Sequence, residues 1–174
     1  MSATWIYTPP PTTALGQPGD DHFAYGFATQ AALVEVDTQS GAVRVLKVVA
    51  AHDVGRAINP RAVVGQVEGG VLMGIGYALS EELLLEQGHV KNADLRRYKV
   101  PRSLSMPEIV PILVEAYSAD GPFGAKGVGE ITSIPTAPAI TNAIYAAVGT
   151  RVTRLPCTLE WLAEELGKEV AADK

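Results

Sequence analysis

The chain has 174 residues, of which 47% are hydrophobic and 19% are charged, and its formal net charge is -5. This length suits one sizeable hydrophobic core and leaves little room for a second full domain. The acidic balance argues against a nucleic-acid surface, which would collect lysine and arginine. Cys157 is the only cysteine, so the chain holds no internal disulfide, thiolate zinc site or cysteine-ligated iron–sulfur cluster.

The N-terminal segment 1–22 is rich in proline and glycine and ends near an acidic pair, Asp20 and Asp21. These residues oppose regular structure, so we expect an arm or linker over 1–22 and one domain over 23–174. No basic region followed by an apolar core is visible at the N-terminus. The sequence therefore predicts no secretory signal, no membrane span and a cytoplasmic location.

Two apolar stretches, 25–36 and 42–50, flank the turn-forming segment Asp37-Thr38-Gln39-Ser40-Gly41. Valines recur in both stretches, which predicts an antiparallel hairpin. A loop over 52–60 is expected to follow at one end of the sheet. His52, Asp53 and Asn59 are interpreted as scaffold residues that cap this loop, and the scattered histidines predict no metal ligands.

Residues 60–85 form the longest predicted helix, because Pro60 suits a first turn and apolar side chains recur every four residues. This helix contains many glycines: Gly65, Gly69, Gly70, Gly74 and Gly76. Each costs about 1 kcal/mol in an exposed helix, so their density predicts close backbone packing or the approach of a ligand.

The rest of the chain predicts further mixed elements. Residues 94–100 are mostly polar and partly extended, 107–117 is a strand, 134–148 is an alanine-rich helix, and 151–155 is a short extended piece. A last helix over 158–166 is capped by Thr158. The predicted fold class is α+β: an antiparallel hairpin and mixed strands packed with a glycine-rich helix and two C-terminal helices.

The segment Gly124-Ala125-Lys126-Gly127-Val128-Gly129-Glu130 combines glycines and small residues with a terminal carboxylate. Such a backbone lets main-chain N–H groups approach a ligand, and Glu130 becomes a candidate base at the same surface. The alternative is an ordinary turn whose glutamate is solvated.

This segment is one of several motifs that follow one another in order. The others are Asp53-Val54-Gly55-Arg56-Ala57-Ile58-Asn59-Pro60, then Gly65-Gln66-Val67-Glu68-Gly69-Gly70, and, after Glu130, Pro138-Ala139-Ile140-Thr141-Asn142-Ala143-Ile144. Together they closely resemble the C-terminal molybdopterin-binding region of the xanthine dehydrogenase and aldehyde oxidase family. The resemblance covers residues 23–166 and is far more specific than one glycine loop.

The resemblance implies a molybdenum-dependent hydroxylation of an N-heterocycle or aldehyde with oxygen derived from water. In that family a glutamate takes a proton from a hydroxyl group on molybdenum, and Glu130 matches it. A carboxylate in a water-poor pocket has a raised proton affinity and suits this task. The resemblance also implies cofactor contact by Gln66 and by main-chain groups of Lys126, Gly127, Val128 and Gly129. For Gln66, a helix glutamine that bonds its neighbour is the alternative.

The resemblance further implies cofactors and partners. The cofactor is molybdopterin with molybdenum, with or without a cytosine nucleotide, while iron–sulfur clusters and FAD are expected only on partner chains. The implied partners are the remaining molybdenum-binding chain, an iron–sulfur subunit and a flavin subunit. A non-catalytic docking module for cofactor or subunit, or a truncated fragment, is the alternative. A small interaction domain that matches by chance would leave the glycine density unexplained.

Overall fold

The structure is a computed structural model that describes residues 2–167, so the end of the expected domain, 168–174, lies outside the described residues. Strands β1 (Ala28–Val36) and β2 (Val43–Asp53) form the predicted antiparallel hairpin, with a register shift between Leu33 and Val34. Asp37 Oδ1 accepts hydrogen bonds from Gln39 N and Ser40 N in the turn. The turn chemistry in the sequence therefore specifies this hairpin correctly.

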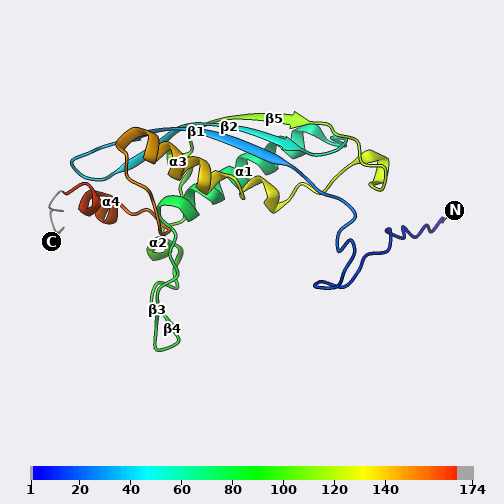
Figure 1. The fold of residues 1–174 in the computed structure, drawn as a ribbon, viewed down its shortest axis with the longest axis horizontal. Helices are drawn as coiled ribbons and strands as arrows, with labels where there is room; N and C mark the ends of the chain where they lie inside the picture. The colour runs from blue at the N-terminus through cyan, green and yellow to red at the C-terminus, as the bar shows by residue number, and fades with distance from the viewer. Residues whose placement is uncertain (1, 168–174) are drawn as a thin grey trace.

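A third strand, β5 (Glu108–Val114), pairs parallel with β2, so the strand order is β1-β2-β5. Two parallel neighbours need a crossover connection. Here it contains α1 (Pro60–Leu79), the small hairpin of β3 (Leu85–Glu86) and β4 (His89–Val90), α2 (Leu95–Tyr98) and the 3-10 turn η1 (Ser103–Ser105). The hairpin β3–β4 projects away from the sheet (Figure 1).

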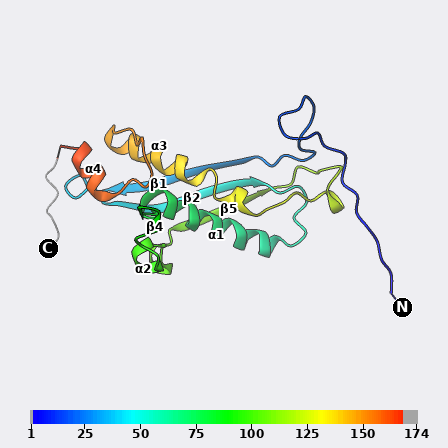
Figure 2. The same cartoon turned by 90° about the horizontal axis from the view of Figure 1, so that it is seen from below.

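Helices α1 and α3 (Thr136–Val148) lie side by side on one face of the sheet, and α4 (Leu159–Glu165) lies near the turn between β1 and β2 (Figures 1 and 2). The core forms where these layers meet, since the inward side chains of β2 and the apolar faces of both helices are buried there. Its fully buried members include Val48, Ala50, Val67, Val71, Ile140, Ile144 and Leu162. The fold is α+β, as predicted.

The glycines of α1 explain how closely the layers approach. A Cβ atom added to Gly70 would lie 1.9 Å from Thr132 Oγ1, and one added to Gly74 would lie 2.4 Å from Thr136 Cβ. A Cβ on Gly76 would overlap Glu81. These three glycines thus confirm the prediction of close packing, whereas a Cβ on Gly65 or Gly69 would meet nothing within 4 Å.

The prediction that the first helix extends to residue 85 is wrong, because α1 ends at Leu79. Ser80 N and Glu81 N both donate to Gly76 O and turn the chain. Asn92 then holds the next segment in a hairpin: its Oδ1 accepts from Leu84 N at 3.0 Å and its Nδ2 donates to Glu82 O at 2.6 Å. Leu83, Leu84 and Leu85 are exposed, so the apolar run past Leu79 was a misleading helix signal.

The prediction of a polar, partly extended segment over 94–100 is wrong for residues 95–98, which form the helical turn α2 because Asp94 Oδ1 caps Arg97 N at 3.0 Å. Residues 151–155, predicted as a short extended piece, are not part of a strand, and the side chain of Arg151 bonds Asn142 Oδ1 on α3 at 2.9 Å. The last helix is confirmed, with Thr158 Oγ1 accepting from Trp161 N. Cys157 is buried, and burial raises the pKa of its thiol.

The N-terminal arm contains no helix or strand between residues 2 and 27. It touches the loop after β5, where Tyr7 OH donates to Asp120 O at 2.7 Å. Of the described helices, α1 alone has the length and apolar composition to cross a membrane. Its Val67, Val71 and Gly74 are nevertheless buried against neighbouring elements, which is typical of a core helix.

Candidate functional site

The glycine segment 124–130 lies beside the loop that leaves β2. Arg56 N donates to Gly124 O at 2.8 Å, and Lys126 N donates to Val54 O at 3.0 Å. Gly55 and Ala125 form an isolated antiparallel bridge, and a Cβ on Gly55 would lie 2.3 Å from Gly124 O. The fold thus brings together two of the motifs that are far apart in the sequence.

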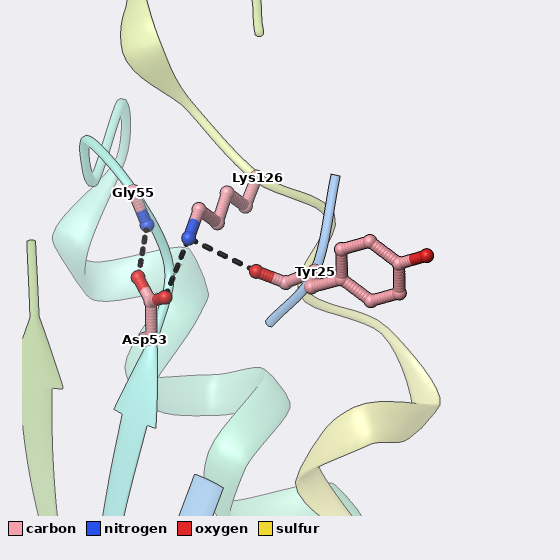
Figure 3. A network of polar contacts seen from close by, with 4 residues as sticks. All are labelled: Tyr25, Asp53, Gly55 and Lys126. Carbon is pink, nitrogen blue, oxygen red and sulfur yellow. Dashed lines mark hydrogen bonds and ion pairs between the residues drawn. The ribbon is translucent and has the colours of Figure 1, made fainter. Parts of the chain in front are cut away.

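A buried ion pair holds the two segments together (Figure 3). Lys126 Nζ lies 2.6 Å from Asp53 Oδ2 and 3.0 Å from Tyr25 O, and the side chains of Lys126 and Asp53 are only 14% and 6% exposed. Gly55 N donates to the other carboxylate oxygen of Asp53 at 3.0 Å. The side-chain ammonium and the main-chain N–H of Lys126 are therefore both used within the chain.

The charge state of Asp53 follows from these contacts. Burial by itself raises the pKa of Asp53, but the hydrogen bonds from Lys126 and Gly55 and the positive charge of Lys126 together outweigh it. The pKa of Asp53 consequently lies below its ordinary value. Asp53 is an ionised structural group that joins strand β2 to the glycine segment.

The structure bears differently on the predictions for the two other scaffold residues, Asn59 and His52. Asn59, predicted to cap the loop before the helix, is the N-cap of α1 itself, because its Oδ1 accepts from Ala62 N at 3.1 Å. His52 does not cap the loop: it is the penultimate residue of β2, fully buried, with Nε2 at 3.2 Å from Gln30 Nε2. Strand β2 continues to Asp53 because β1 pairs with it as far as His52 and β5 pairs with it as far as Asp53.

Gln66 reaches across from α1 to the glycine segment. Its Nε2 donates to Val128 O at 3.3 Å, so its partner is distant in sequence and is not a helix neighbour. A pocket of about 230 Å³ lies between these segments, and its polar lining includes Arg56, Gln66 and Lys126. The predicted residues Gln66, Lys126 and Val128 therefore share one surface.

The remaining backbone of the glycine segment is open. Within residues 2–167, the N–H groups of Gly127, Val128 and Gly129 donate no backbone hydrogen bond. A Cβ on either Gly127 or Gly129 would meet nothing within 4 Å, as at Gly65 and Gly69 on α1. Unpaired N–H donors beside open backbone suit the close approach of an anionic group such as a pterin phosphate.

Glu130 begins the 3-10 turn η3 (Glu130–Thr132), and its main chain is fixed by Ser133, whose N and Oγ donate to Glu130 O at 3.0 and 2.8 Å. Its side chain is exposed and does not line the 230 Å³ pocket. The expected water-poor surroundings of Glu130 are thus not provided by the described part of the chain.

Sequence reasoning missed a buried polar cluster behind Glu130. Gln30 Nε2 donates to Thr132 O at 2.8 Å, and Thr136 Oγ1 donates to Gln30 Oε1 at 2.7 Å. Thr132 and Thr136 are almost completely buried. The available signal was a polar residue, Gln30, on the inward side of β1 among Ala32 and Val34.

Residues 2–167 contain no group of three or more histidine, cysteine, aspartate or glutamate side chains able to hold a metal ion. A molybdenum atom bound through a pterin dithiolene does not need such a group. The open glycine backbone and Gln66 fit the binding of this cofactor through its pterin and phosphate.

Comparison with known proteins identifies the family of this chain. The model of the molybdopterin cofactor-binding domain family matches residues 1–107. The xanthine dehydrogenase molybdenum-binding subunit of Escherichia coli O157:H7 is 38% identical over 132 residues, covering 75% of this chain and 18% of that protein. The aldehyde oxidoreductase molybdenum-binding subunit PaoC of Escherichia coli K12 is 38% identical over 143 residues, covering 80% and 20%.

Solved structures are similar as well. The aldehyde oxidoreductase from Desulfovibrio gigas superposes with a TM-score of 0.79 at 35% identity, covering 86% of this chain and 16% of that chain. Quinoline 2-oxidoreductase from Pseudomonas putida 86 gives a TM-score of 0.74 at 32% identity, covering 79% and 18%. The chain spans at most about a fifth of the length of these relatives. It belongs to the molybdopterin cofactor-binding domains of the xanthine dehydrogenase and aldehyde oxidase family.

Proposed function

We propose that this chain forms one wall of a molybdopterin site in a molybdenum hydroxylase that oxidises an N-heterocycle or an aldehyde. The observation that carries the proposal is the convergence of Gln66 with the open backbone of residues 127–129. Three similar proteins are named as a xanthine dehydrogenase subunit, an aldehyde oxidoreductase subunit and a quinoline 2-oxidoreductase, and these names support both substrate classes.

In this proposal the chain binds the cofactor mainly through its main chain. The N–H groups of Gly127, Val128 and Gly129 donate to anionic oxygen or sulfur atoms, and the amide of Gln66 adds a polar contact. Lys126 contributes by fixing the backbone through its ion pair with Asp53. When bound, the molybdenum cofactor supplies two-electron oxidation of a substrate carbon with oxygen from water.

Glu130 is proposed as the general base, which accepts a proton at a carboxylate oxygen. Support comes from its position at the end of the glycine segment, where η3 fixes its main chain and leaves the carboxylate free to face a ligand. Because Glu130 is exposed on this chain, the proposal requires other parts of the complex to exclude water around it.

The proposal includes partners. The rest of the molybdenum-binding portion, an iron–sulfur subunit and a flavin subunit would supply substrate contacts and electron transfer, since this chain spans only about a fifth of its relatives. The pterin can carry a cytosine nucleotide, and the complex is proposed to be cytoplasmic.

A second candidate function is a docking module that holds cofactor or subunit without turnover. The absence of Glu130 from the lining of the 230 Å³ pocket favours it. The Glu130→Gln substitution separates the two functions when turnover is measured in the assembled complex and divided by molybdenum content. Loss of turnover with retained molybdenum supports the base, whereas unchanged turnover supports the docking module. Glu164→Gln, an exposed carboxylate on α4, is the matched control.

A further inference from the structure

We propose that Gln30 is a positioning residue that fixes the turn carrying Glu130. This inference rests on the proposed role of Glu130 as the base. Gln30 lies on the inward side of β1, in a row whose other members, including Ala32 and Val34, pack on the hydrophobic core. An amide in such a row is costly unless its hydrogen bonds are made, so its partners indicate its purpose.

Those partners fix the orientation of the Gln30 amide. Nε2 faces two acceptors, Thr132 O at 2.8 Å and His52 Nε2 at 3.2 Å, while Oε1 accepts from Thr136 Oγ1 at 2.7 Å. The opposite amide orientation would place Gln30 Oε1 against Thr132 O, so that two acceptors would face each other. Burial lowers the pKa of His52, so the ring is neutral and one nitrogen is free to accept.

Thr132 links Gln30 to the turn that carries Glu130. Its carbonyl is held by Gln30, and its Oγ1 lies 2.9 Å from Gly129 O and 3.1 Å from Gln66 O. Gly129 and Thr132 flank Glu130 on either side. The turn is consequently anchored to the sheet through Gln30 and to α1 through Gln66, near the same Gln66 that reaches Val128.

The turn packs closely against two glycines of α1. Thr132 lies against Gly70, where a Cβ would be 1.9 Å from Thr132 Oγ1, and Thr136 lies against Gly74. The glycines of α1, the buried threonines and Gln30 thus act together. Their effect is to restrain the main chain on both sides of Glu130, at Gly129 and at Thr132.

The test substitutes Gln30→Met, which keeps the volume of the side chain and removes every hydrogen bond of the amide. Two quantities are measured in the assembled complex: kcat per molybdenum, and KM. Amide hydrogen exchange of residues 129–133 is measured in addition, as a readout that does not depend on turnover. Val48→Ala, a core truncation in β2, controls for loss of stability alone.

We expect Gln30→Met to lower kcat per molybdenum by about 10–100-fold, because small misplacements of a reacting group have effects of this size. KM should stay within about twofold, and exchange at residues 129–133 should accelerate. Val48→Ala should destabilise the fold while keeping kcat. Unchanged exchange and unchanged kcat in Gln30→Met would overturn the proposal, as would an equal loss of kcat in Val48→Ala.

Two further variants are measured, one as a replacement for Gln30→Met and one as a separate test of Glu130. If Gln30→Met fails to fold, Gln30→Glu is judged by the same criteria, since it keeps an acceptor for Thr136 and removes the donor to Thr132. Glu130→Gln is measured in parallel. If Glu130→Gln retains full turnover, the base assignment fails, and the exchange data alone then decide whether Gln30 orders the turn.

Discussion

Lys126 Nζ lies 2.6 Å from Asp53 Oδ2, at a point where the end of β2 meets the glycine segment. Both side chains are largely buried, and Tyr25 O accepts a second hydrogen bond from the same ammonium group. The pair and its bond to Tyr25 O therefore join three separate parts of the chain: the segment before β1, the end of β2 and the segment that carries Glu130. The side chain of Lys126 therefore fixes the backbone of the glycine segment.

Lys126→Met should lower the free energy of unfolding by about 3–5 kcal/mol, because it leaves the Asp53 carboxylate buried without its counter-charge. Urea unfolding followed by circular dichroism measures this change. Lys47→Met is the control, since Lys47 pairs with Glu108 at the surface and should cost less than about 1 kcal/mol. Equal losses of unfolding free energy in the two variants would show that the Lys126–Asp53 pair stabilises the fold no more than a surface pair does.

His52 predicts a pH dependence of stability. Burial lowers the pKa of its imidazole, so the unfolded chain binds a proton more readily than the folded chain. The stabilisation from a neutral His52 is complete above its ordinary pKa of about 6.5 and is lost as the pH falls through the lower folded pKa. His52→Gln keeps an acceptor for Gln30 but cannot titrate.

The free energy of unfolding of the wild type should hence fall more steeply than that of His52→Gln as the pH drops from about 7.5 to 5. Urea titrations at a series of pH values measure both slopes. Parallel curves for the two proteins would contradict the prediction, because they would mean that His52 takes up its proton equally well in the folded and unfolded states.

Adjacent glycines of α1 make a matched pair. Gly70→Ala should destabilise by about 1–3 kcal/mol, because its Cβ would displace Thr132. Gly69→Ala should stabilise the isolated chain by about 0.5–1 kcal/mol, since its Cβ meets open space and alanine favours a helix. Thermal unfolding of both variants checks the sign of each change. A shift in the same direction for both would contradict the packing described for Thr132.

Local patterns in the sequence predicted several elements correctly. The turn at Asp37–Gly41 specified the hairpin, Pro60 marked the start of α1, and Thr158 marked the start of α4. Each of these signals acts between neighbours in the chain, which is why a sequence alone reveals it. The glycines at 70 and 74 also indicated close packing, although the residues that pack there could not be named.

Long-range contacts account for what the sequence did not reveal. The parallel pairing of β5 with β2 joins segments separated by the whole crossover, and no local pattern encodes it. The segment after α1 depends on Asn92, whose side chain bonds the backbone of Glu82 and Leu84. The bonds from Lys126 to Asp53 and from Gln30 to Thr132 likewise form only once the fold has brought distant residues together.

The central claim is that this chain forms part of a molybdopterin site, and it is tested most directly by metal analysis of the complex purified from the native source. Molybdenum and iron are counted per copy of the chain, alongside the native mass. We predict molybdenum together with iron and larger partner chains. A chain that purifies alone and free of molybdenum would contradict the account.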